Sequence, residues 1–322
     1  MYVISSRTSN PKRVTANGDW AVLFSGNGKP PNDPPLPPSN YLAAGFLNSL
    51  VDPLLVVMHG YNNLESEAFS QFANISGLTV SDNSLPAHEF FGTIIGFDWP
   101  SLGSHSPALW KQFNLYKHDL DAARGAAVPA LESFLDRLTN AVRGRGIRVN
   151  LMAHSMGNFV VSRVLTANPG LASRLDNVVS FAPDMLQSDL EQPELVAAAD
   201  ALAGNWFVYW AQADVVLLTA SDWANILLGN EQWGGRRLGQ EGPPTNGHFS
   251  RKVVTQCWDV PLSKQMGSTY NWDLREWPYS TKIHGLYWSN GPFLDNVVAN
   301  VCRAEGCPPV VVDWAVQARA AS

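Results

Sequence analysis

The feature that most constrains this chain is a series of short apolar segments, rich in β-branched residues, that alternate with longer amphipathic stretches. An unbroken apolar segment of four to eight residues is typical of a strand covered on both faces. Apolar residues at three- and four-residue steps over 116–142 indicate a helix, and 158–167 reads as another. The apolar segments are residues 54–58, 93–97, 149–153, 178–182 and 206–211. This order predicts an α/β fold with a mostly parallel central sheet, helices on both faces and reactive groups at the carboxyl ends of the strands.

Charge and hydropathy exclude several classes of protein. The chain has 322 residues and a net charge of −6, so we expect no nucleic-acid partner, since binding to phosphates needs a basic surface. No apolar stretch reaches the length of a membrane helix, and the opening residues are polar where a signal peptide is apolar. We therefore expect no transmembrane segment and a cytoplasmic protein, or a secreted one if the sequence is a processed form.

The proline pattern suggests how the chain is organised. Six prolines within 26–40 exclude a helix or a central strand there, because proline fixes φ and lacks an amide hydrogen. We expect residues 1–50 to supply a strand and a proline-rich arm packed on the core. Residues 51–305 are expected to form one catalytic domain, and 306–322 a C-terminal tail.

A strand followed by a sharp turn and a helix carries the main candidate for chemistry. The segment 149–153 leads into Ala153-His154-Ser155-Met156-Gly157. Such a turn holds a serine in a strained, exposed conformation and aims the next amide at the oxyanion. Small residues two positions before and after the serine let the strand and the helix approach closely. We predict Ser155 as the nucleophile and the Met156 amide as one oxyanion donor.

A second strand end supplies the other half of an oxyanion hole. Segment 54–58 leads into His59-Gly60-Tyr61, and we predict that the Tyr61 amide is the second donor. The loss of one such donor typically costs about 10²- to 10³-fold in rate, so evidence for both matters. The alternative interpretation is an ordinary Gly-Asn turn after a strand.

These motifs and several others occur together in a fixed order. They are HGYNN after a strand, FDWPSLG, AHSMGN, FAPD, an aspartate after the next strand, RRLG, and a late histidine followed by aromatic residues. In this combination the chain resembles the α/β-hydrolase fold, and most closely a bacterial family within it whose function is uncharacterised. The resemblance covers about residues 50–300. It implies a serine hydrolase in which the acid and then the histidine follow the nucleophile along the chain.

That order limits the choice of acid and base to residues beyond Ser155. Asp214 comes just after segment 206–211 and is the predicted acid, with Asp184 as the alternative. His284 lies between the expected last strand (252–260) and the expected last helix (293–302). A base has to project from the loop between these two elements, so His284 is the predicted base. His248 precedes that strand and is the alternative.

Aromatic residues gather in the last third of the chain. Eight of the twelve tryptophans lie between positions 206 and 288. They suggest a cap or loop insertions, approximately 220–247 and 262–283, that form an aromatic-walled pocket for the substrate. The alternative is that these tryptophans pack long loops onto the sheet. For His154 the alternative is a role in packing or in supporting the nucleophile without contact with the substrate. The predicted substrate-binding residues are His59, Trp99, His154 and Trp288.

Together these residues predict a carboxylesterase that acts on small-molecule esters with short to medium acyl or aromatic groups, through an acyl-enzyme. The alternatives are a thioesterase, an amidase, an acyltransferase or a lipase with the same triad, and a non-catalytic scaffold. No cofactor or metal is predicted, because there is no HExxH motif and no cluster of histidines and cysteines. Homo-oligomerisation stays open, as does a bond between Cys302 and Cys307.

Overall fold

The computed structural model describes residues 1–6, 21–24, 44–61, 63–77, 90–101, 109–212, 214, 216–217, 236–258 and 284–305. The predicted arm (26–40), the insertion 262–283, most of the insertion 220–247 and the tail (306–322) lie outside these ranges. Within the described part of the chain, no helix is long and apolar enough to cross a membrane.

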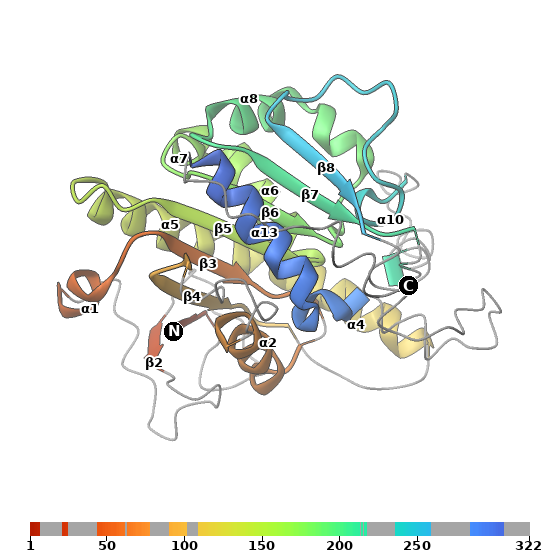
Figure 1. The fold of residues 1–322 in the computed structure, drawn as a ribbon. Helices are drawn as coiled ribbons and strands as arrows, with labels where there is room; N and C mark the ends of the chain where they lie inside the picture. The colour runs from red at the N-terminus through yellow and green to blue at the C-terminus, as the bar shows by residue number, and fades with distance from the viewer. Residues whose placement is uncertain are drawn as a thin grey trace, which may run out of the picture.

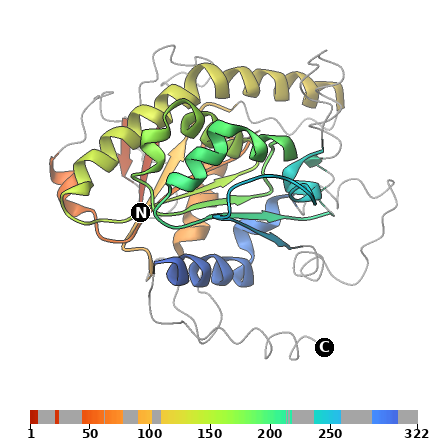
Figure 2. The same cartoon turned by 90° about the horizontal axis from the view of Figure 1, so that it is seen from above.

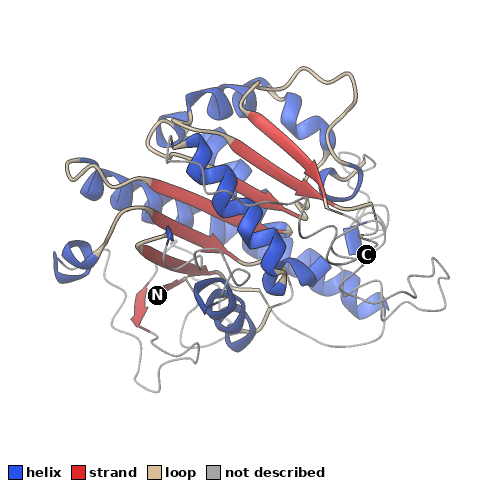
Figure 3. Cartoon of the chain, in the orientation of Figure 1, coloured by secondary structure: helices blue, strands red, loops and turns tan. Residues whose placement is uncertain are grey.

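The described strands form one eight-stranded sheet in the order β2-β1-β4-β3-β5-β6-β7-β8. All neighbouring pairs are parallel except β1 and β2 at one edge, which are antiparallel. The predicted α/β class and parallel sheet are therefore confirmed (Figure 3). The strands are β1 Tyr2–Ser5, β2 Ala21–Phe24, β3 Leu54–Met58, β4 Thr93–Asp98, β5 Val149–His154, β6 Val178–Phe181, β7 Trp206–Trp210 and β8 Val253–Cys257.

Helices cover both faces of this sheet (Figures 1 and 2). α2 and α13 lie on one face, and α4, α5, α6 and α8 lie on the other. The α-helices are α1 Ala44–Ser49, α2 Glu65–Gly77, α4 Leu109–Ala122, α5 Val128–Arg143, α6 Met156–Ala167, α7 Pro169–Ala172, α8 Pro193–Ala201, α10 Leu238–Glu241 and α13 Gly291–Ala304. The 3-10 and π segments are η1 Ala123–Ala127, η2 Gln187–Glu191 and η6 Tyr287–Ser289.

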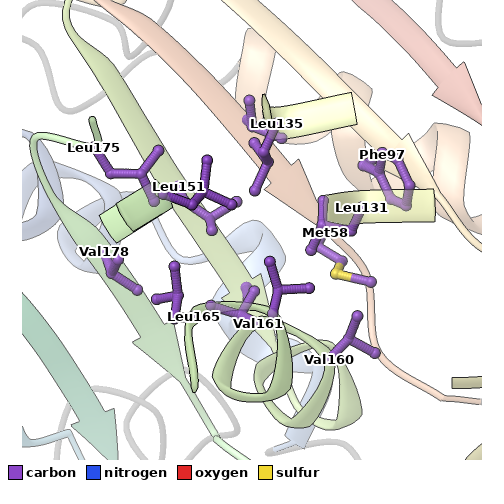
Figure 4. Close-up of a cluster of buried hydrophobic side chains, with 14 of the residues drawn as sticks. Met58, Phe97, Leu131, Leu135, Leu151, Val160, Val161, Leu165, Leu175 and Val178 are labelled. Carbon is purple, nitrogen blue, oxygen red and sulfur yellow. The ribbon is translucent and has the colours of Figure 1, made fainter. Parts of the chain in front are cut away.

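The central strand β3 is apolar at every position because it contributes to two cores. In β3, Val56 and Met58 face the core under α5 and α6, whereas Leu55 and Val57 face the core under α2 and α13. Successive strand residues point to opposite faces, so a sheet covered on both sides needs apolar residues at every position. Figure 4 shows part of the first core, where Met58 and Leu151 lie against side chains of α5 and α6.

The helix predicted over 116–142 is longer than expected and is interrupted. It starts at Leu109 and continues as α4, η1 and α5 to Arg143. In the π segment the amide of Val128 donates to the carbonyl of Ala123, five residues back. Pro129 follows, and it has no amide hydrogen and a ring that crowds the preceding turn. The wider π turn accommodates the proline without ending the helix.

Candidate active site

Ser155 lies at the junction of β5 and α6 with φ 50° and ψ −125°. The strained turn is as expected, but the residue is only 2% exposed rather than open to solvent, and the described hydrogen bonds include none between its hydroxyl and His284 Nε2. Among the described non-glycine residues, it shares a positive φ only with Ala182. Such a conformation costs about 1–3 kcal/mol and persists only where the surroundings impose it. Here the Ser155 amide donates to the Phe181 carbonyl, and the Asn158 side chain donates to the carbonyls of Ala153 and Ser155. Asn158, the last residue of the AHSMGN motif, was given no role of its own from the sequence.

Two glycines let the backbone pack tightly around this turn. A Cβ atom on Gly157 would stand 2.6 Å from the main-chain oxygen of His59, which a side chain does not tolerate. A Cβ atom on Gly60 would stand 2.8 Å from the Cβ of Ser155. The turn after β3 and the turn after β5 are therefore in direct contact, as the two proposed halves of an oxyanion hole require.

His284 and Asp214 form a buried pair. Nδ1 of His284 donates to Oδ2 of Asp214 at 2.7 Å, and the Asp214 carboxylate is completely buried. Burial lowers the pKa of His284, but the charge and hydrogen bond of Asp214 and the charge of Asp184 outweigh it, so the pKa lies above the usual 6.5. Nε2 of His284 is buried and has no hydrogen-bond partner among the described residues. This nitrogen is left available to accept a proton.

The alternative acid and base lie in different surroundings. Oδ2 of Asp184 accepts a hydrogen bond from the Tyr116 hydroxyl at 2.8 Å, and Oδ1 lies 3.4 Å from the Arg237 guanidinium. His248 is exposed before β8, and its main-chain amide donates to the Glu191 carboxylate. Of the two predicted acids, Asp214 contacts the His284 imidazole, whereas the contacts described for the Asp184 carboxylate are with Tyr116 and Arg237.

The turn after β3 holds the Gly60–Tyr61 peptide in a defined orientation. The Gly60 carbonyl accepts hydrogen bonds from His59 Nδ1 at 2.7 Å and from Asn63 Nδ2 at 3.2 Å. The carbonyl and the following amide of a trans peptide point in opposite directions. The Tyr61 amide is therefore directed away from both donors.

The side chains of His59 and Trp99 pack against this turn and form hydrogen bonds with its main chain. Nε2 of His59 lies 3.0 Å from Oδ1 of Asp98, and its ring stacks on the Trp99 indole at a centroid distance of 5.3 Å. The Trp99 indole also donates to the main-chain oxygen of His59. Both side chains are 0% exposed. In the described structure both side chains therefore support the turn, and the prediction that they bind substrate stays a prediction.

His154 and Trp288 also lie in the interior. Nε2 of His154 donates to the main-chain oxygen of His284 at 2.7 Å. Trp288 is 3% exposed in the core under α13 and packs on the rings of His154 and Phe181. Trp288 thus packs in the interior, in keeping with the alternative interpretation, and its pocket-lining role stays a prediction.

No group of three or more histidine, cysteine, aspartate or glutamate side chains among the described residues is arranged to hold a metal ion. Cys302 is buried in α13, and Cys307 lies outside the described part of the chain.

The family described as "Alpha/beta hydrolase of unknown function (DUF900)" matches residues 41–226, more than half of the chain. No curated protein matches. Among solved structures, an esterase from Pyrobaculum calidifontis is 11% identical, with 75% of this chain and 77% of that chain covered and a TM-score of 0.34.

Two further solved structures are similar in the same way. The poly(3-hydroxybutyrate) depolymerase LpqC from Bordetella parapertussis is 17% identical, with 83% of this chain and 84% of that chain covered and a TM-score of 0.37. Acetyl xylan esterase 1 from Thermoanaerobacterium sp. is 13% identical, with 86% of each chain covered and a TM-score of 0.33.

Proposed function

Since this chain belongs to the DUF900 family of alpha/beta hydrolases, we propose that it is a serine carboxylesterase with Ser155 as nucleophile, His284 as base and Asp214 as acid. The observation that carries the proposal is the buried 2.7 Å bond between His284 and Asp214, held against the strained turn of Ser155 through His154. Strained serines at a strand–helix junction and buried Asp–His pairs are both costly, and together they fit nucleophilic catalysis.

In the proposed mechanism, Oγ of Ser155 attacks the ester carbonyl while Nε2 of His284 takes its proton. The amides of Tyr61 and Met156 stabilise the oxyanion. The imidazolium then protonates the leaving alcohol, which departs and leaves an acyl group on Oγ. A water molecule, deprotonated by His284, attacks the carbonyl of this acyl-enzyme. The C–Oγ bond then breaks, the imidazolium returns its proton to Ser155 Oγ, and the carboxylic acid is released. Asp214 keeps the Nδ1 proton in place and stabilises the imidazolium in both steps.

The substrate is proposed to be a small ester with a short to medium acyl or aromatic group. A panel of nitrophenyl esters of increasing acyl length, with a matching thioester and anilide, tests both the reaction and its alternatives. We expect ester hydrolysis by the wild type and a loss of at least about 10³-fold in Ser155→Ala. If the thioester or the anilide is turned over faster than the ester, the protein is a thioesterase or an amidase rather than an esterase.

Ser162→Ala is a matched control on the same helix. Ser162 is also buried, and its hydroxyl donates to the Phe159 carbonyl rather than facing the proposed site. We expect this variant to keep wild-type turnover. Undiminished ester hydrolysis by folded Ser155→Ala would contradict the proposed function.

A further inference from the structure

The imidazole of His154 lies between the two turns that flank the proposed nucleophile. On one side its Nε2 donates to the main-chain oxygen of His284 at 2.7 Å. On the other side its Nδ1 faces Gly60, whose added Cβ would stand 2.9 Å from this nitrogen. The ring is 4% exposed and lies 4.6 Å from the His284 ring, centroid to centroid. His154 is therefore in contact both with the turn that begins at His284 and with the turn after β3 that contains Gly60.

The protonation state of His154 is well defined. A carbonyl oxygen only accepts hydrogen bonds, so the proton of a neutral His154 must be on Nε2. Burial, followed by the nearby charges of His284 and His59, holds the pKa of His154 well below its usual range despite the hydrogen bond to the His284 carbonyl. His154 thus stays neutral, with Nε2 as a permanent donor and Nδ1 as a bare lone pair.

This hydrogen bond links the main chain of the proposed base to the residue that precedes the proposed nucleophile. His284 is held at two points, its side chain by Asp214 and its main chain by His154. His154 is the last residue of β5 and is covalently joined to Ser155. Any shift of the turn that starts at His284 relative to Ser155 must therefore break or stretch the His154 bond.

We propose that His154 is a positioning residue that fixes the distance between the His284 imidazole and the Ser155 hydroxyl. The proposal rests on the proposed function and extends it. In this proposal the His154 side chain touches no reacting atom. It acts on the mechanism through its hydrogen bond to the main chain of His284.

Two substitutions separate positioning from packing. His154→Phe keeps an aromatic ring against Phe181 and Trp288, its packing neighbours, but removes the donor. His154→Gln loses the ring but restores an amide donor at a similar reach. A packing role predicts that Phe is the milder change, whereas a positioning role predicts that Gln is.

The first readout is the split between kcat and KM in the ester assay. We expect His154→Phe to lower kcat by about 10²-fold, the effect of a misplacement of about 1 Å, and to leave KM nearly unchanged. His154→Gln should recover most of that loss. Thr139→Val is the matched control, because it removes another buried hydrogen bond from a side chain to a main-chain carbonyl, in α5. An equal fall of kcat in the control would overturn the proposal.

The second readout needs no substrate. NMR titration of His284 in the complete chain follows its pKa, which the facing groups Asp214, Asp184 and His154 influence. If His154→Phe frees the turn, the Asp214 contact loosens and the pKa of His284 falls toward 6.5. An unchanged titration together with an unchanged kcat would refute the role of His154.

These readouts distinguish the two proposals. If the wild type cleaves no acyl substrate, the proposed function fails, while the titration still decides whether His154 positions His284. If His154→Phe does not fold, His154→Asn replaces it, since the shorter amide does not reach the His284 carbonyl as Gln does. Equal kcat and equal His284 titration in the Asn and Gln variants would then refute the proposal.

Discussion

Replacing Asp214 by asparagine tests the assignment of the acid with almost no change in shape. The Asp214 carboxylate accepts the Nδ1 proton of His284 at 2.7 Å in a site closed to solvent. The amide group of asparagine donates to Nδ1 instead, which moves the imidazole proton to Nε2. In that tautomer Nε2 no longer accepts the proton of Ser155, and the positive imidazolium also loses its buried counter-charge.

Both losses act on the transition state. We expect kcat to fall by about 10⁴-fold, equivalent to about 5.4 kcal/mol, because an orienting aspartate of this kind contributes on that scale. The assay is steady-state hydrolysis of the best nitrophenyl ester, with thermal unfolding measured on the same samples. The melting temperature should change little, since the new side chain has the same size.

Asp184→Asn is the matched control, because Asp184 is buried at the end of the neighbouring strand and was the alternative acid. Its carboxylate raises the pKa of His284 by its charge but binds Tyr116 and Arg237. We expect a loss of no more than about tenfold, the size of one pKa unit in His284. A 10⁴-fold loss in Asp184→Asn with near-normal turnover in Asp214→Asn would refute the assignment.

Four further predictions concern the base, its titration and two buried positions near the site. His284→Ala should abolish turnover, whereas His248→Ala should retain it. Wild-type kcat/KM should rise with pH through a midpoint above 6.5, because the base acts in its neutral form and its pKa is raised. A midpoint below 6.5 would contradict this prediction. Gly157→Ala should lower the free energy of unfolding by about 1–3 kcal/mol in urea, since its Cβ meets the His59 carbonyl; unchanged stability would show that the backbones separate freely. Trp288→Ala should lower the free energy of unfolding by about 3–5 kcal/mol without changing the preference for acyl length. A changed preference at unchanged stability would support the predicted pocket role of Trp288.

The strands could be predicted because their signal is local. Segment 54–58 coincides with β3. Segments 93–97 and 149–153 start where β4 and β5 start and stop one residue short of their ends. Burial on both faces is visible in any five consecutive residues, so no knowledge of their partners is needed. The short strand β2 and the helix α2 were not predicted, since α2 buries Ala68, Phe69, Phe72 and Ile75 within an otherwise polar stretch.

The candidate site was predicted in its residues but not in its supporting contacts. A turn motif and the order of the elements point to Ser155, Asp214 and His284, and the structure brings the latter two together. The bond between His154 and the His284 carbonyl joins residues 130 positions apart, and a main-chain acceptor leaves no trace in the sequence. The same holds for Asn63, whose amide orients the Gly60 carbonyl.

Covalent labelling of the complete, folded chain with a fluorophosphonate tests the account at its centre. We expect one adduct per chain, located on Ser155 by peptide mass spectrometry, absent in Ser155→Ala and formed far more slowly in Asp214→Asn. A folded wild type that forms no adduct, or that carries it on a serine other than Ser155, would contradict the account.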